Sequence, residues 1–173
     1  ESDFQALALE IFRFQSRNVP VYKDFISHLN IHPDRIKDIY EIPFLPVELF
    51  KTHEIIAQNK KAEIIFESSS TTGVIPSRHF VADKSIYEES FLKGFRNFYG
   101  DPAGLCILAL LPSYLERSGS SLVYMSEALI RQSGHVASGF YLEEHDKLIS
   151  LLRSIKNSGQ SAILLGVSYA LID

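Results

Sequence analysis

Five consecutive hydroxyl residues followed by a glycine form the most chemically distinctive stretch of this chain. They come directly after an apolar run at residues 64–66 and Glu67, and the stretch reads Ser68, Ser69, Ser70, Thr71, Thr72 and Gly73. Hydroxyl side chains compete for nearby backbone groups and disfavour helix, and so many of them cannot form a core. Hydroxyl protons, the N–H groups of a tight turn and a glycine can surround an anion. We therefore predict a phosphate-binding loop, with a solvent-exposed Ser/Thr loop as the alternative.

The residues after this tract support the same hypothesis. Pro76 and Ser77 are followed by Arg78 and His79, which add positive charge on the far side of the turn. The chain has no Gly-Lys-Ser/Thr after the glycine and no Gly-x-Gly-x-x-Gly, so neither a Walker loop nor a dinucleotide fingerprint is present. Residues 77–81 could also return as a strand beside residues 64–66, which would place the tract at the tip of a hairpin.

A second polar loop lies between a predicted strand and a predicted helix, where free N–H groups can bind an anion. Its candidate residues are Tyr114, Glu116, Arg117, Ser118 and Ser120. Glu116 and Arg117 could equally be a solvated ion pair.

A third candidate, Gly166-Val167-Ser168-Tyr169-Ala170, resembles the nucleophile elbow of serine hydrolases with alanine in its last place. That fold orders its triad as serine, acid and histidine. No histidine follows Ser168, and His135 and His145 precede it. A serine acyl-hydrolase or acyltransferase therefore stays the weaker alternative.

The elements that must position these loops follow from apolar periodicity. Predicted strands at 64–66, 105–111, 136–141 and 162–167 alternate with three helical stretches. Asp83 can cap the first helix, in which one apolar stripe is formed by Tyr87, Phe91, Phe95 and Phe98. Ser118 or Ser120 can cap the second, whose inward residues are Leu122, Met125 and Leu129. Gly159 can end the third, whose inward residues are Leu148, Leu151, Leu152 and Ile155. This order predicts an α/β fold with a doubly wound, mostly parallel sheet and flanking helices. Such sheets bind ligands at the carboxyl ends of their strands.

A mostly helical segment over residues 1–60 precedes the α/β part at 61–173. Phe4, Leu7, Ile11 and Phe12 predict an amphipathic helix over 3–16. A second helix is expected over 21–29, a brief one through Ile36 and Ile39, an extended connector at 42–46, and a helical turn within 46–51.

Composition excludes several classes of protein. The 173 residues are 46% hydrophobic with a net charge of −4, which argues against general nucleic-acid binding. No apolar run approaches the roughly 20 residues of a membrane span. The single Cys106 excludes an intramolecular disulfide, so a cytoplasmic location is the default expectation. No spacing of His, Cys, Asp and Glu indicates a structural metal.

The hydroxyl tract resembles the phosphate loop of the adenylate-forming, acyl-CoA synthetase-like superfamily, Ser-Ser/Gly-Gly-Thr-Thr-Gly-x-Pro-Ser/Lys. Ser68 and Ser69 match its opening, Thr71, Thr72 and Gly73 its centre, and Pro76 and Ser77 its close. Ser70 stands where the family usually has glycine, and one extra residue separates Gly73 from Pro76. Residues 42–51, 111–122 and 166–171 narrow the resemblance to the acyl-protein synthetases, the long-chain-fatty-acid–luciferin-component ligases and their bacterial relatives.

This resemblance implies ATP and Mg²⁺ as cofactors and a carboxylic acid, expected to be a fatty acid, that is activated as its acyl-adenylate and passed to a protein or thiol acceptor. It implies phosphate binding by residues 68–73 with Ser77 and Arg78, and an acid pocket bordered by Tyr114–Ser121 and by Ser168 and Tyr169. The ribose-binding acid, the catalytic lysine and the acyl-accepting cysteine would lie beyond Asp173, so we expect a fragment of a longer enzyme and assign no catalytic residue. The alternative is a non-catalytic module that binds phosphate or nucleotide.

Overall fold

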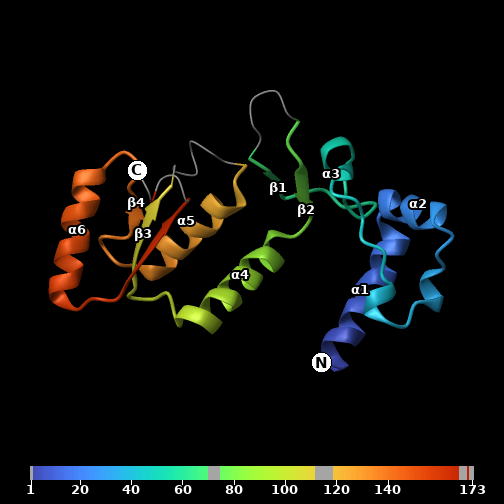
Figure 1. The fold of residues 1–173 in the computed structure, drawn as a ribbon, viewed down its shortest axis with the longest axis horizontal. Helices are drawn as coiled ribbons and strands as arrows, with labels where there is room; N and C mark the ends of the chain where they lie inside the picture. The colour runs from blue at the N-terminus through green and yellow to red at the C-terminus, as the bar shows by residue number, and fades with distance from the viewer. Residues whose placement is uncertain (1, 70–74, 112–118, 168–170, 172–173) are drawn as a thin grey trace. The chain divides into compact units, whose positions relative to one another are not determined.

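The computed structural model describes residues 2–69, 75–111, 119–167 and 171. It divides the chain into two units, Glu1–Lys84 and Ser85–Asp173 (Figure 1). The change from helical to strand-forming sequence near residue 60 predicted a boundary there. The difference arises because the strands that follow residue 60 form a hairpin that packs with the first unit.

Helices dominate the first unit. Their bounds are α1 Ser2–Asn18, α2 Pro20–His28 and α3 Leu49–Thr52, with 3-10 turns η1 Pro33–Arg35 and η2 Ile39–Glu41. Val19 has extended backbone angles and separates α1 from α2, and Pro20 starts α2, where its missing N–H costs no hydrogen bond. The single helix expected through Ile36 and Ile39 is wrong: Ile36 and Asp38 have extended backbone angles, which leave two separate turns.

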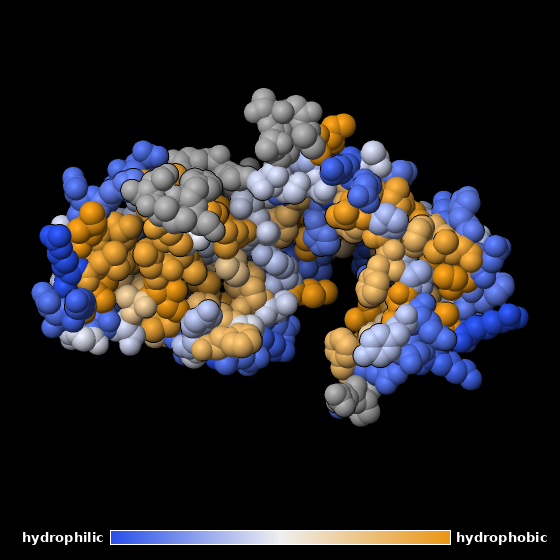
Figure 2. Space-filling model, in the orientation of Figure 1, coloured by the Kyte–Doolittle hydropathy of each residue, from blue (hydrophilic) through white to orange (hydrophobic). Residues whose placement is uncertain are grey.

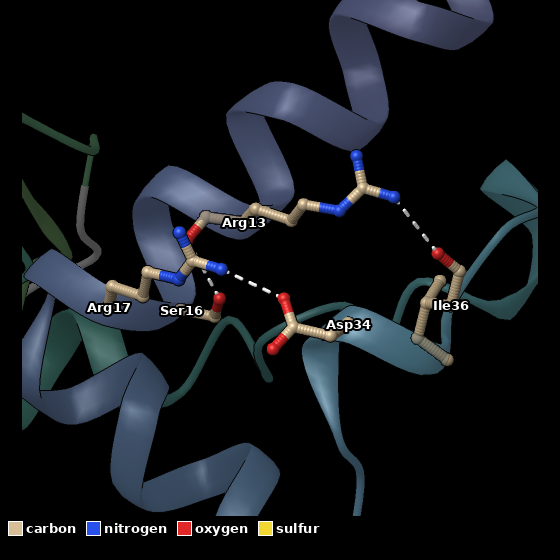
Figure 3. Close-up of polar contacts among 5 residues, drawn as sticks. All are labelled: Arg13, Ser16, Arg17, Asp34 and Ile36. Carbon is tan, nitrogen blue, oxygen red and sulfur yellow. Dashed lines mark hydrogen bonds and ion pairs between the residues drawn. The ribbon is translucent and has the colours of Figure 1, made fainter.

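Polar contacts hold the segment after α2 against α1 (Figure 3). Arg13 donates to the carbonyl oxygen of Ile36 at 3.3 Å, and Arg17 pairs with Asp34 at 2.8 Å. The Arg17–Asp34 pair is exposed, and such pairs contribute about 0–1 kcal/mol. Apolar packing therefore provides most of the stability of this unit.

The apolar core of the first unit consists of Phe12, Val19, Tyr22 and Ile26. Ile36, which follows η1, and Ile42 and Leu45 of the connector pack against it. The Tyr22 hydroxyl donates to the carbonyl oxygen of Pro43 at 2.7 Å, and burial raises the pKa of Tyr22 to about 12. The connector forms neither helix nor strand, as predicted, and its bond to Tyr22 fixes it to the core.

The inward face of α1 differs from the one expected. Leu9, Phe12 and Ser16 are buried, whereas Phe4, Leu7 and Ile11 are exposed. The sequence pattern detected the helix but could not show which apolar side chains meet α2, because α1 carries apolar residues on two faces.

The remaining part of the first unit is an antiparallel hairpin formed by β1 Ile64–Glu67 and β2 Arg78–Val81. Its register pairs Ile64 with Val81 and Glu67 with Arg78. The ring of His79 stacks on Phe50 of α3 with centroids 6.2 Å apart, which attaches the hairpin to the helical part. The hairpin suggested by the sequence is confirmed, and the inclusion of residues 64–66 in the parallel sheet is wrong.

The second unit contains a three-stranded parallel sheet of order β4-β3-β5. Its strands are β3 Cys106–Leu110, β4 Gly139–Phe140 and β5 Ala162–Gly166. Every residue of the central strand β3 is buried. A strand with neighbours on both sides and helices on both faces needs a continuous apolar sequence, and residues 105–111 supply it.

Helices cover both faces of this sheet. Their bounds are α4 Lys84–Tyr99, α5 Ser121–Ser133 and α6 His145–Ser158. Cys106, Leu108 and Leu110 pack with Leu148 of α6, while Ile107, on the other face, packs with Phe95 of α4 and Leu129 of α5. The alternation along β3 thus sorts the helices into two layers, and the predicted α/β class with flanking helices is confirmed.

The predicted strand at 136–141 is shorter in the structure. Gly134 ends α5 with a left-handed φ of 59°, and Val136 is 99% exposed. The side chain of Ser138 replaces the backbone carbonyl that a longer strand would offer to β3, because Ser138 Oγ accepts from the N–H of Ile107 at 2.9 Å. The side chain of Ser133 donates to Ser138 Oγ at 2.7 Å and completes this buried network.

Two helix faces also differ in part from expectation. Phe98 of α4 and Leu122 of α5 are exposed, whereas Val123 and Ser126 of α5 are buried. The α5 face is therefore rotated by about one residue from the predicted one. Gly159 ends α6 with φ 70° as predicted, and the inward residues of α6 are confirmed.

Cys106 is inaccessible to solvent, and burial raises the pKa of its thiol. Because thiol reagents attack the thiolate, we expect slow labelling of the native chain and fast labelling after unfolding. The measurement is the rate of reaction with a chromogenic disulfide reagent in buffer and in denaturant. Equal rates under the two conditions would contradict a structural role for this residue.

Candidate functional site

The residues at the base of the loop that carries the hydroxyl tract, Ser68 and Ser77, are held together at the loop end of the hairpin. The N–H of Ser68 donates to the carbonyl oxygen of Ser77 at 3.0 Å, and the N–H of Ser77 donates to Ser68 Oγ, also at 3.0 Å. The tract that links them is therefore clamped at its base by one backbone bond and one side-chain bond. Ser70, Thr71, Thr72 and Gly73 lie outside the described residues.

The clamp affects the hydroxyl of Ser68 directly. A hydroxyl has one proton to donate, and accepting the bond from Ser77 leaves that proton free to turn toward an anion. Ser69 is exposed next to it. Of the predicted phosphate-binding residues, the structure therefore brings Ser68, Ser69, Ser77 and Arg78 together at one end of the hairpin.

The guanidinium of Arg78 lies 5.3 Å from the centroid of the Phe80 ring. Phe80 is farther than Arg78 from the hydroxyl tract along β2, so this contact keeps the guanidinium group away from the tract. A cation–π contact of this kind contributes about 0.5–1 kcal/mol, less than the roughly 1.5–3 kcal/mol of a hydrogen bond to a charged group. A phosphate near the tract could therefore draw the guanidinium toward itself.

Glu67, which the sequence analysis did not select, stands opposite Arg78 in the hairpin register. Directly opposite residues of an antiparallel pair project to the same face. A carboxylate thus shares the face of Arg78 and precedes the hydroxyl tract by one residue. The signal in the sequence that could have found Glu67 is its charge, opposite to that of Arg78 on the other predicted strand of the hairpin.

The second candidate region is the carboxyl edge of the parallel sheet. Leu110 pairs with Gly166, so the chain leaves β3 and β5 at the same edge. Ser120 caps α5 at this edge by accepting from the N–H of Val123 at 3.4 Å, which decides between the two predicted caps. Tyr114, Glu116, Arg117, Ser118, Ser168 and Tyr169 lie outside the described residues. Of the hydroxyl residues predicted to border the acid pocket, Ser120 and Ser121 can be placed.

The start of α5 is bound to α4 by two tyrosines that the sequence analysis did not assign to a site. The Tyr87 hydroxyl donates to the carbonyl oxygen of Ser121 at 3.1 Å, and the Tyr124 hydroxyl donates to Glu88. Burial raises the pKa of Tyr87. The carboxylate of Glu88 lies beside the first turn of α5, where the helix dipole favours negative charge. An anionic substrate bound at this turn would have to share the positive end of the helix dipole with the carboxylate of Glu88.

The structure describes both histidines that were weighed for the serine-hydrolase alternative, His135 and His145. His135 precedes β4 and lies at the amino edge of the sheet, because β3, β4 and β5 are parallel. His145 begins α6, after β4, and Ser168 lies outside the described residues. His135 Nδ1 also accepts from the N–H of Ala137 at 3.1 Å, which gives this ring a turn-stabilising role.

Gly166 at the end of β5 is in close contact with the side chain of Leu171. A Cβ atom there would lie 2.8 Å from Cγ of Leu171 and 3.4 Å from Cβ of Leu110. The N–H of Leu171 donates to the carbonyl oxygen of Val167 at 3.2 Å, so the chain turns back over Gly166. A larger residue at position 166 would therefore have to displace the side chain of Leu171, which is 49% exposed.

Among the described residues, no group of three or more His, Cys, Asp or Glu side chains is arranged to hold a metal ion. None of the described helices is both long and apolar enough to cross a membrane.

Comparisons of the chain with protein-family models, with curated proteins and with solved structures found no match.

Proposed function

We propose that this chain takes part in the ATP-dependent activation of a carboxylic acid, expected to be a fatty acid, as its acyl-adenylate, followed by transfer to a thiol or protein acceptor. The observation that carries this proposal is the clamp between Ser68 and Ser77. It closes the hairpin at the base of a tract of consecutive hydroxyl residues and a glycine, with Arg78 as the next residue.

The chemistry needs such a loop. A carboxylate that attacks the α-phosphate of ATP expels pyrophosphate, so negative charge must be neutralised on the leaving group while the two anions are held in line. Hydroxyl protons and turn N–H groups can grip the β- and γ-phosphates without requiring a positively charged protein. This suits a chain whose net charge is −4. Arg78 would add a single charge from the neighbouring strand.

The proposed acid pocket lies at the carboxyl edge of the parallel sheet, which we assign to a doubly wound fold of the adenylate-forming type. Support comes from helices on both faces of the sheet and from the capped start of α5 at the edge where β3 and β5 end. Open α/β sheets bind ligands at this edge. Ser120 would border the pocket, and the hydroxyl groups of Tyr87 and Tyr124 would hold the first turn of α5 in place.

ATP would supply the adenylyl group, and Mg²⁺ would offset the charge of its phosphates. The donors at the hairpin fit phosphate oxygens, since hydroxyl, N–H and guanidinium groups all donate. A cytoplasmic setting is part of the proposal, and the buried single thiol agrees with it.

The test has two parts. Isothermal calorimetry of the 173-residue chain with pyrophosphate and with MgATP measures phosphate binding directly. Acid-dependent ATP–pyrophosphate exchange, with fatty, aromatic and amino acids, measures adenylate formation in this chain and in one extended past Asp173. We expect weak binding and no exchange by the 173-residue chain, and exchange by the extended chain with one class of acid.

The outcomes separate the alternatives. Binding without exchange in either chain would favour a non-catalytic phosphate-binding module. Absence of binding by both chains, in folded protein, would contradict the proposal.

Replacing Glu67 with glutamine should tighten pyrophosphate binding by roughly two- to tenfold at low salt, because one negative charge beside the tract is removed. Calorimetry at two salt concentrations checks this, and the gain should shrink as salt rises. Glu127→Gln, at an exposed position of α5, is the matched control and should leave binding unchanged. Equal effects of both substitutions would show that net charge, and not position, is responsible.

A further inference from the structure

The outward face of α1 carries a row of large apolar side chains. Phe4, Leu7, Ile11 and Phe14 are exposed by 67%, 54%, 48% and 54%, although Leu9 and Phe12 already bury the opposite face of the same helix. Figure 2 shows apolar surface along this part of the first unit. We call Phe4, Leu7, Ile11 and Phe14 the α1 stripe. Contiguous apolar surface of this kind marks an interaction site.

The spacing of the α1 stripe indicates what kind of partner it fits. Its members are separated by three, four and three residues, which is the a/d spacing of a heptad. Two helices that pack along such a seam interlock their side chains. An acyl chain or a flat surface would not require this spacing, so the pattern points to a second helix.

The stripe is also complementary to itself. If a second copy of α1 lies antiparallel about a two-fold axis near Leu9, Phe4 faces Phe14 of the second copy and Leu7 faces its Ile11. Every member of the stripe then has an apolar partner. A two-fold interface must match itself in this way, because the same surface is used by both copies.

The side chains that flank the stripe fit the same arrangement. Asp3 of one copy would lie beside Arg17 of the other, twice in the dimer, and Ala8 beside Ala8 would allow close approach of the helices. Arg17 can take part because its present pair with Asp34 is exposed. The one unfavourable contact would bring the two Glu10 side chains together near the axis.

The available area is sufficient for a stable dimer. Phe4 and Ile11 also line an apolar groove of about 630 Å³, whose described lining contains no charged side chain. Tyr40 and Phe44, also in the lining, are 91% and 86% exposed. With the α1 stripe they offer on the order of 700 Å² of apolar surface per copy, against about 800 Å² per partner in a standard interface.

We propose that a second copy of this chain covers the α1 stripe, through antiparallel pairing of α1 with α1 about a two-fold axis. This interaction is independent of the proposed acyl activation, and neither requires the other.

Sedimentation velocity over a range of concentrations is the first test. We expect a dimer of twice the 19.6 kDa chain mass. Leu7→Asp should weaken dimerisation by at least about 100-fold, because each dimer would bury two unpaired carboxylates. Val136→Asp, which also replaces an exposed apolar side chain with a carboxylate but in the second unit, should have no effect. Glu10→Gln should strengthen dimerisation severalfold, and a gain of this kind cannot come from misfolding.

Disulfide cross-linking is the second test and reports the direction of pairing. In a double variant, Phe4→Cys with Phe14→Cys, each new thiol would face the other position of the second copy, within the roughly 7 Å between Cα atoms that a disulfide allows. The two positions are ten residues apart in one helix, about 15 Å, so they cannot link within a chain. Each single variant should fail to cross-link, because its two copies would also be about 15 Å apart. Cys106 contributes little background, since it is buried.

Dimerisation with cross-linking of the double variant alone supports the proposal. A chain that stays monomeric at about 100 μM, a dimer that Leu7→Asp does not weaken, or cross-linking of the single variants would each overturn it. A monomer in which a fatty acid protects a thiol at position 7 from labelling would instead assign the stripe to an acyl chain.

Discussion

Ile107→Ala is expected to lower the free energy of unfolding of the second unit by about 3 kcal/mol. Ile107 is fully buried in the central strand β3 and packs with Phe95 and Leu129 from two different helices. Truncation removes apolar contacts and leaves a cavity that the sheet cannot close, because β3 is held by strands on both sides. Ile107→Val should cost only about 1 kcal/mol, since it removes a single methylene-sized group.

The measurement is urea unfolding followed by the reactivity of Cys106, the neighbouring residue, which reports on the second unit alone. Ile149→Ala is the matched control, because Ile149 is exposed on α6 and its truncation should change stability by less than about 0.5 kcal/mol. Equal losses from Ile107→Ala and Ile149→Ala would show that β3 is not the centre of this core.

Gly73→Val is expected to abolish pyrophosphate and nucleotide binding while the chain stays folded. The prediction rests on the sequence pattern of the hydroxyl tract. A β-branched residue resists positive φ, and its side chain blocks the close approach of backbone N–H groups to a phosphate. The hairpin should form as before, because its strands pair through residues 64–67 and 78–81 and its clamp uses Ser68 and Ser77.

Calorimetry with pyrophosphate and circular dichroism on the same samples separate loss of binding from loss of fold. Gly94→Val is the matched control: Gly94 lies within α4, and an added Cβ meets no atom within 4 Å. Undiminished binding by a folded Gly73→Val chain would remove the hydroxyl tract from the proposed mechanism. Loss of binding in both variants would point to a general effect of the substitution.

Local signals in the sequence were sufficient for most of the elements. Ser120 as a cap of α5, Gly159 as the end of α6, and the apolar run of β3 were all predicted at or near their observed positions. These features depend on residues within one or two turns of each other, since a cap or a left-handed glycine satisfies only nearby backbone groups. Neighbouring residues in the printed sequence therefore carry the information.

The predictions from sequence were wrong where two segments far apart in the chain compete for the same hydrogen-bonding strand. The apolar run at 64–66 fits a parallel sheet as well as a hairpin, and the pairing with β2 leaves it outside the sheet. Val136 has the character of a strand residue, yet the side chain of Ser138 satisfies the N–H of Ile107 and the strand begins only at Gly139. The bond partner of a strand is decided by hydrogen bonds across long stretches of chain, which a local pattern does not specify.

By itself the sequence determined the α/β class, the hydroxyl tract as the most distinctive candidate site, and the helix that contains Phe4, Leu7 and Ile11. Only the tertiary structure decided that Ser68 and Ser77 clamp the base of that tract, that the guanidinium of Arg78 lies over Phe80, and that the apolar side chains of α1 are divided between a core and an exposed stripe. The physical reason is that periodicity shows which side chains share a face of a helix, whereas the packing of another element against that helix determines which face is buried.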